Sequence, residues 1–220
     1  MHKRLAFLSL IALSLVGCKV EHVSRITDSQ LDGSIQTVQA TARIEVMACT
    51  DYQDKSKPSN SLVEADSLVK KLFSTSEFQG CHNENFKSIA TYLVPMDVGS
   101  WQSDEEFTPK NITIVKNKHE NVFFAIPQNI IDGVKKYEQQ PMADDINLNI
   151  KIRYVNDSDK DVSLNFLAAY VNNDPLVSGK TTIPPNKNVD FLLSNVSSDQ
   201  ALKRGFAFTF TKEKDTTNQK

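Results

Sequence analysis

The last third of the chain alternates apolar and polar residues in short runs, and this pattern constrains the fold more than any other feature. In "INLNIKIRYV" (146–155) and "VSLNFLAAY" (162–170), every second residue is apolar over most of the run. Shorter runs follow near 176–182, 189–193 and 206–210, separated by segments rich in Asn, Asp, Pro and Gly. Such alternation is typical of strands with one buried face, and the intervening residues favour turns. The pattern therefore predicts five short strands.

Two helices are predicted between further strands. Apolar residues recur at helical spacing over 62–75, after a Ser61–Glu64 pair that fits a capping box. A second apolar pattern predicts a short helix over 128–138, despite Gly133 within it. These helices make the expected class α+β, with strands in the majority.

Three earlier segments also predict strands. Residues 37–49 alternate cleanly and predict a strand that ends at Cys49. Residues 111–126 contain two apolar runs around "KNKHE", which predicts a hairpin. In the apolar run 88–98, Pro95 cannot donate a ladder hydrogen bond, so we expect this strand at a sheet edge or interrupted at its end.

The charge of the chain argues against nucleic-acid binding. The formal net charge is −2, and without Lys3 and Arg4 it becomes −4. Nucleic-acid binding needs Lys and Arg clustered on one face, and the sequence contains no basic block of that kind.

The first 17 residues have the layout of a secretory signal peptide. Lys3 and Arg4 form a positive start, and residues 5–16 form an apolar core. A membrane-spanning helix needs about 20 apolar residues, so this core is too short to be one. The alternative is a cytosolic protein with an apolar N-terminal helix.

The end of this segment, Leu15-Val16-Gly17-Cys18, resembles the lipobox of bacterial lipoproteins. The resemblance implies cleavage between Gly17 and Cys18 and attachment of lipid to Cys18, which would make the lipid bilayer a partner. Lys19 follows where an Asp tends to retain enteric lipoproteins in the inner membrane, so its presence implies sorting to the outer membrane. The alternative is an ordinary cleaved signal that leaves Cys18 as a free or disulfide-bonded thiol.

The expected organisation after the signal is a tether followed by one or two folded regions. Residues 18–33 lack clean periodicity and are expected to form a lipidated tether in which His22 is solvated. Residues 34–140 are expected to form an α+β region and 141–212 a sandwich-like region, which together can make one compact domain. Residues 213–220 are expected to be a disordered tail.

Cys49 and Cys81 are expected to form a structural disulfide. Two cysteines left over in an exported protein usually pair in an oxidising compartment. Free thiols, a redox pair or a metal site remain alternatives, but redox pairs are normally close in sequence. His82 follows Cys81, yet no second Cys/His cluster accompanies it, so no metal site is predicted.

The last third resembles the immunoglobulin-like sandwich modules of many exported bacterial proteins. The resemblance rests on the alternating strands, the stretch "AYVNNDPL" and the stretch "IPPNKNVDFLL". It implies an antiparallel immunoglobulin-like β-sandwich in the C-terminal third, and it concerns shape alone. The whole chain is also similar to small uncharacterised bacterial and prophage-borne lipoproteins, a likeness that implies no activity.

The sequence contains no catalytic motif, and we predict no catalytic residue and no cofactor. Asp157, Asp159 and Asp161 alternate like the start of a calcium loop, but the later ligand positions hold Val162 and Ala168. They are therefore expected to form a solvated turn. His119 is expected in a loop. Trp101 is expected either to cap the core edge or to contact a partner.

These observations together predict a non-enzymatic outer-membrane lipoprotein. Its β-rich domain would bind an envelope protein or glycan, or help to assemble an envelope component. One alternative is a prophage-encoded surface factor that blocks a receptor or excludes other phages. Another is a cell-envelope hydrolase, which would need a polar cleft with converging carboxylates or His82.

Overall fold

The computed structural model describes residues 18–140 and 145–213, and strands make up most of this part. In chain order its elements are β1 (Cys18–Thr27), α1 (Asp28–Asp32), β2 (Gln36–Val46), α2 (Asn60–Leu72), β3 (Glu77–Glu84), β4 (Lys87–Trp101), β5 (Ile112–Asn117), β6 (Asn121–Ala125), α3 (Gln128–Glu138), β7 (Ile146–Val155), β8 (Val162–Val171), β9 (Asp174–Ile183), β10 (Asn188–Leu193), α4 (Asn195–Arg204) and β11 (Phe206–Lys212).

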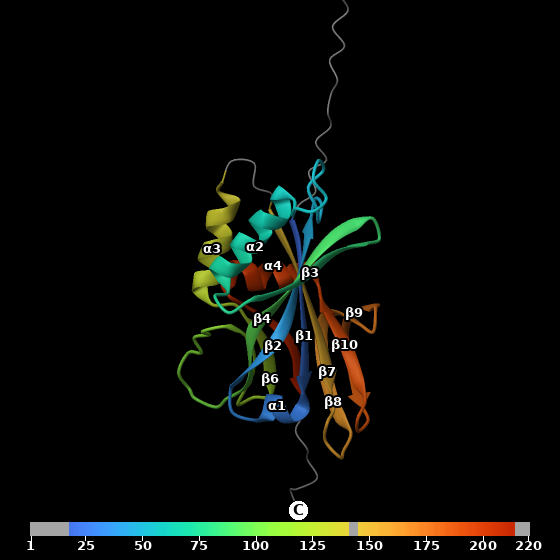
Figure 1. Cartoon of the computed structure of the whole chain (residues 1–220). Helices are drawn as coiled ribbons and strands as arrows, with labels where there is room; N and C mark the ends of the chain where they lie inside the picture. The colour runs from blue at the N-terminus through green and yellow to red at the C-terminus, as the bar shows by residue number, and fades with distance from the viewer. Residues whose placement is uncertain (1–17, 141–144, 214–220) are drawn as a thin grey trace, which may run out of the picture.

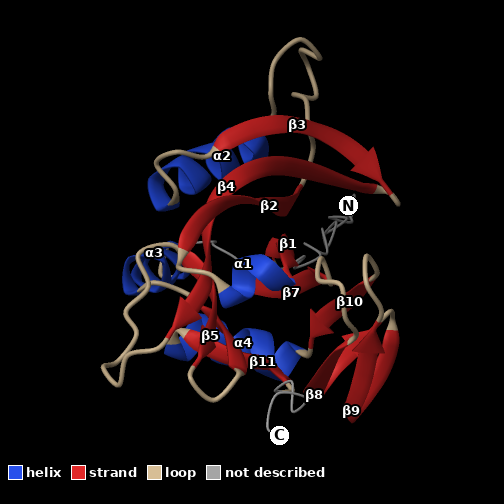
Figure 2. Cartoon of the chain, turned by 90° about the horizontal axis from the view of Figure 1, so that it is seen from below, coloured by secondary structure: helices blue, strands red, loops and turns tan. Residues whose placement is uncertain are grey.

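Nine of the described strands form a closed, mixed β-barrel (Figures 1 and 2). Around the barrel the order is β10-β7-β1-β2-β4-β5-β6-β11-β8, and β8 pairs again with β10 to close the ring. The β1–β7 and β4–β5 pairs are parallel, and the other neighbours in the ring are antiparallel. β3 and β9 extend the sheet beyond the ring by pairing with β4 and β8.

The predicted immunoglobulin-like sandwich is wrong, because the C-terminal strands do not pair only with one another. β7 lies beside β1 over ten residues, and β11 lies beside β6. Alternation of period two shows which side chains of a strand face a core, but it does not show which strand is the neighbour. A sandwich and a barrel therefore give the same sequence pattern. The predicted β-rich α+β class is confirmed, because the described residues combine four helices with a mixed barrel.

The barrel interior is filled by the apolar side chains of alternate strand positions. Phe210 stacks on Phe191 with ring centroids 5.1 Å apart, and Tyr154 meets Phe210 edge-on at 5.6 Å. All three residues are fully buried. Buried aromatic pairs of this kind add about 0.5–1.5 kcal/mol each beyond the burial of their surface, so these rings help to hold the C-terminal strands together.

The predicted tether is also wrong for residues 18–33, which form β1 and α1. β1 is one of the barrel strands, with β7 paired on one side and β2 on the other. His22, Ser24 and Ile26 point inward and are buried. The strand was missed because two of the four residues on its inward face, His22 and Ser24, are polar, so its alternation does not stand out in the sequence.

The helices cover the ends and one side of the barrel. Figure 2 shows α1 lying across one end, where Leu31 is fully buried. α2 and α3 lie side by side (Figure 1), and Gly133 allows this close approach because a Cβ there would collide with the Leu72 side chain. α4 packs against β7 and β11. Among the described residues, no helix combines the length and apolar character needed to cross a membrane.

Most of the predicted local elements are present. The strand over 37–49, the hairpin over 111–126 and the helix over 128–138 are confirmed. The predicted helix over 62–75 begins at Asn60, because Ser59 rather than Ser61 caps it by accepting a hydrogen bond from the Leu62 amide at 3.1 Å.

The predicted edge position of the strand around Pro95 is wrong. β4 has β2 along one side, and β3 followed by β5 along the other. Pairing with β3 ends at Leu93 and pairing with β5 begins at Met96, so Pro95 lies at the change of partner. A residue without an N–H is tolerated there because a gap in the ladder already exists.

Candidate functional site

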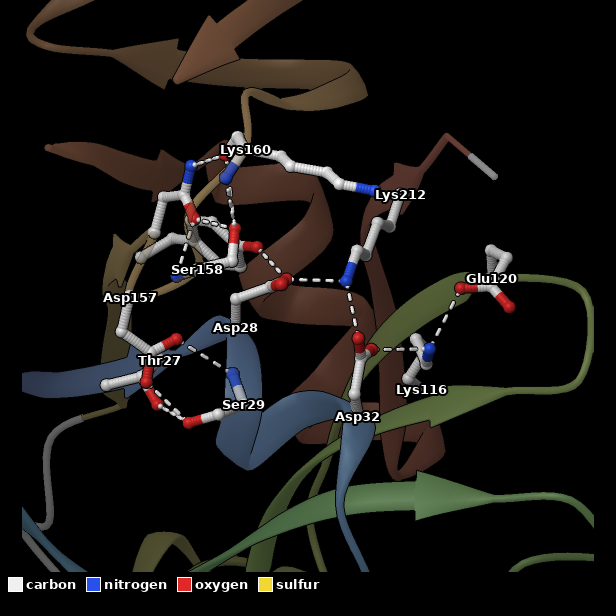
Figure 3. Close-up of polar contacts among 12 residues, drawn as sticks. Thr27, Asp28, Ser29, Asp32, Lys116, Glu120, Asp157, Ser158, Lys160 and Lys212 are labelled. Carbon is white, nitrogen blue, oxygen red and sulfur yellow. Dashed lines mark hydrogen bonds and ion pairs between the residues drawn. The ribbon is translucent and has the colours of Figure 1, made fainter. Parts of the chain in front are cut away.

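A group of charged side chains gathers where α1 closes the barrel. We call Asp28, Asp32, Lys116, Glu120 and Lys212 the α1 network (Figure 3). The Lys212 ammonium lies 2.6 Å from both Asp28 Oδ1 and Asp32 Oδ2. The Lys116 ammonium lies 2.6 Å from Asp32 Oδ1 and 2.9 Å from Glu120 Oε2. The network thus joins both ends of α1 to strands β5 and β11.

The α1 network lies largely out of solvent. The side chains of Lys116 and Asp28 are 9% exposed. Burial alone would lower the pKa of Lys116, but hydrogen bonds to Asp32 and Glu120 outweigh it and raise this pKa. Burial would likewise raise the pKa of Asp32, but hydrogen bonds from Lys116 and Lys212 lower it. Lys116 and Asp32 therefore stay charged near neutral pH.

Further hydrogen bonds reinforce the same contact. Tyr154, inside the barrel, donates its hydroxyl proton to Asp28, and burial together with this bond raises the tyrosine pKa. Thr27 caps α1 in a reciprocal pair with Gln30. Asp157 accepts a hydrogen bond from the Ser29 amide at 2.9 Å. Removing one member of a buried ion pair leaves the other charge unpaired and costs several kcal/mol, so we assign the α1 network a structural role.

His22 lies inside the barrel, which corrects the prediction that it is solvated. It is 2% exposed, and its ring meets Phe124 edge-on at a centroid distance of 5.1 Å. Its Nε2 atom has no hydrogen-bond partner among the described residues. Burial lowers its pKa to about 4, so the imidazole is neutral in the folded protein at pH 7.

The structure confirms the Cys49–Cys81 disulfide, with the two Cα atoms 5.5 Å apart. It links the loop after β2 to β3. A loop of this length implies a contribution of roughly 3–4 kcal/mol in the chain-entropy model. Cys18 is the first residue of β1, in register with Ile146, and Lys19 beside it is exposed. Gly17 lies outside the described residues.

Of the other predicted residues, Trp101 and His119 line the same surface hollow, and His82 lies apart from them. His82 is exposed on β3, with its Nε2 atom 3.6 Å from Glu84. His119 occupies the turn between β5 and β6. Trp101 ends β4, and its Nε1–H donates to the Glu105 carbonyl at 3.1 Å while its ring packs on Phe107. Within the described ranges, no His, Cys, Asp and Glu side chains group in a way that could hold a metal.

The surface of the described residues includes the following two hollows. One, of about 260 Å³, lies between Trp101, Phe107, His119 and Phe123. The other, of about 210 Å³, lies near the start of β1 and is lined by Lys19 and by ion-paired residues of β2 and of the β3–β4 hairpin. In this second hollow, Arg43 pairs with Glu21 at 2.8 Å and Lys87 with Glu45 at 2.7 Å, so its charges largely neutralise one another.

The β8–β9 hairpin carries a surface that the sequence reasoning missed. β9 pairs with β8 and with no other described strand, so it presents a free edge. Val177 is 87% exposed and Leu167 is 56% exposed, and Tyr170 and Leu176 lie nearby and are exposed. The signal was the adjacent apolar pair Leu176-Val177, because two neighbours on a strand point to opposite faces and only one can enter a core.

The fold and its sites therefore define a closed mixed β-barrel with one end bridged by a short helix. The chain belongs to the family described as a domain of unknown function, DUF7424, whose model matches residues 23–216. No curated protein and no solved structure matched the chain.

The burial of His22 predicts a dependence of stability on pH. The pKa of His22 is about 4 in the folded state and about 6.5 in the unfolded state. Between these values the unfolded chain binds the proton preferentially, so stability falls as the pH drops from 6.5 towards 4, by up to about 3 kcal/mol. We expect His22→Leu to remove this part of the slope in urea unfolding at pH 7, 5.5 and 4.5.

His119→Leu is the matched control, because His119 is exposed in a turn. This variant should keep the wild-type pH dependence. An unchanged slope in His22→Leu would show that the histidine is not buried in its neutral form.

Proposed function

We propose that this protein is a non-enzymatic outer-membrane lipoprotein whose barrel binds another component of the cell envelope. The lipobox-like segment ends at Cys18, after an apolar core over 5–16 and before Lys19 rather than Asp. Acyl chains on Cys18 would anchor the chain, since one chain gives only marginal binding whereas two or more give stable attachment.

One observation carries the proposal: the cysteine of the lipobox-like segment is the first residue of the first barrel strand. Its register with β7 begins at Cys18, opposite Ile146, and continues to Thr27, opposite Val155. Cleavage before Cys18 would therefore leave in place every residue of β1 whose pairing the structure describes. The position is compatible with processing, and it would hold the barrel close to the membrane without a spacer.

The binding part of the proposal rests on the free edge of β9. An extended segment of another protein can add to an exposed edge through main-chain hydrogen bonds, while pockets and apolar contacts give specificity. Natural edges are usually protected by Pro, Lys or a covering element. β9 has Pro175 and Lys180, but the residues between them include the exposed Leu176 and Val177. We propose that this stretch receives an extended, apolar segment of an envelope protein.

Replacing the proposed attachment cysteine tests the anchor. We expect Cys18→Ser to abolish incorporation of labelled palmitate and to release the protein from the membrane fraction, because a serine hydroxyl cannot form the thioether. The matched control is the double variant Cys49→Ala/Cys81→Ala, which should keep the label although it loses the disulfide. Label retained in full by Cys18→Ser would contradict the proposal.

Site-specific crosslinking in intact cells tests the binding edge. A photo-reactive amino acid at Val177 should give an adduct of defined mass several-fold more abundant than one at Val196. Val196, on α4, is the control because it is also an exposed valine, at 77%. Equal adducts at both positions, or none at Val177, would exclude β9 as the contact surface.

A further inference from the structure

The three most exposed large hydrophobic side chains in the described part of the chain lie at one end of the barrel. Phe86 is fully exposed, Met47 is 92% exposed and Tyr52 is 90% exposed. We call these three residues the apolar rim. Their exposure is unusual because fully exposed large side chains gain nothing from the core, and apolar side chains gathered together mark interaction sites.

Strand register places the apolar rim beside the start of β1. Val20 pairs with Ile44, so the end of β2 lies next to Cys18, and Met47 directly follows that end. Val46 in turn pairs with Ser88, two residues after Phe86. Figure 1 shows the loop after β2 and the β3–β4 hairpin at the upper part of the barrel, where β1 begins, and α1 at the opposite end.

Two constraints hold the rim residues in place. Phe86 lies in the tight turn between β3 and β4, with a φ of 63°, and Asn85 before it has a φ of 48°. Positive φ at two successive residues is the backbone of the two-residue turns that fit a twisted hairpin, so the turn itself fixes where Phe86 lies. The loop that carries Tyr52 is fixed by the Cys49–Cys81 disulfide and by a bridge between Thr50 and Pro58. The exposed side chains are therefore displayed on braced turns.

The charges around the apolar rim balance. The Lys55 ammonium lies over the Tyr52 ring, 5.6 Å from its centre, and Lys57 pairs with Asp54 at 3.0 Å. The charged residues of the loop over 47–58 and of the adjacent hollow are five cations and five acids: Lys19, Arg43, Lys55, Lys57, Lys87, Glu21, Glu45, Asp51, Asp54 and Glu84. A surface without net charge does not select an acidic or a basic partner. Aromatic tips flanked by lysines are typical of the bilayer interface.

We propose that the apolar rim inserts into the headgroup region of the bilayer in which Cys18 is anchored. This inference rests on the proposed acylation of Cys18. Because β1 starts at Cys18, acyl chains there would bring this end of the barrel to the membrane, within reach of the rim. Acyl chains and rim together would hold the barrel in one orientation, with the α1 end pointing away and the β9 edge along the side (Figure 1).

Fluorescence of the acylated full-length protein in phosphatidylcholine vesicles tests this orientation. An environment-sensitive dye is attached through Phe86→Cys or Tyr52→Cys, which adds one free thiol because Cys49 and Cys81 are paired. We expect a blue-shifted emission and at least twofold quenching by lipids brominated near the headgroup. A dye at Val177→Cys is the matched control, since Val177 is also highly exposed, and it should show neither effect. Circular dichroism checks that each variant is folded.

The outcomes distinguish insertion of the apolar rim from the acylation of Cys18 on which it rests. An acylated protein whose dyes at positions 86 and 52 stay unquenched overturns the rim but leaves the anchor. Mass spectrometry that finds Cys18 without acyl groups overturns the anchor. The same dyes on Cys18→Ser protein mixed with vesicles, in which the introduced cysteine is the one free thiol, then decide the rim alone, because quenching supports it and its absence overturns it. Binding that requires anionic lipid would also contradict an uncharged rim.

Discussion

The parallel pairing of β1 with β7 is the contact on which the rest of the structure depends. It joins residues 18–27 to residues 146–155, which are far apart in the sequence, and it makes the N-terminal strand the link between the two halves of the sheet. Closing so long a loop costs conformational entropy, and the ladder together with the burial of Ile26, Ile150 and Ile152 offsets that cost. Without this ladder the ring of strands would be open between β1 and β7.

The two ends of the barrel are finished in opposite ways. At one end, α1 continues directly from β1 and is fixed by ion pairs with Lys116 and Lys212. At the other end, the turns carry exposed apolar side chains and balanced charges. The first arrangement covers the end of the barrel and pairs the charges around it, so this end needs no partner to be stable in water. The second leaves the side chains of Met47, Tyr52 and Phe86 uncovered, which is unfavourable in water and favourable at a bilayer. The start of β1 at this second end connects the two halves of the functional proposal.

Local structure could be predicted from the sequence wherever the pattern depends on neighbours in the chain. The alternation over 37–49, the helix over 128–138 and the hairpin over 111–126 are of this kind. The disulfide could be predicted on another ground, because two cysteines remained to pair in an oxidising compartment. The neighbours of each strand could not be predicted, because alternation describes faces and not partners. Pro95 was misplaced for this reason: a central strand tolerates it where β4 changes partner from β3 to β5.

The site residues also divide into those that a local sequence motif reveals and those that depend on contacts between distant segments. Cys18 and Lys19 were found from a short local motif, and their chemistry remains a proposal. His22 was misread because burial depends on contacts with Ala42 and Ile150 of other strands. The α1 network was also invisible in the sequence, since Asp28, Lys116 and Lys212 come from three distant segments. Membership of a family of unknown function adds no activity, so the functional account rests on where these residues lie.

Hydrogen–deuterium exchange of residues 19–27 tests the central claim most directly. If β1 is a barrel strand paired on both sides, its amides should exchange as slowly as those of β2, because exchange requires opening of the barrel. Exchange as fast as that of the loop over 102–110 would mean that the segment is a tether after all. That result would contradict the closed barrel, the buried state of His22 and the direct attachment of the barrel to its anchor.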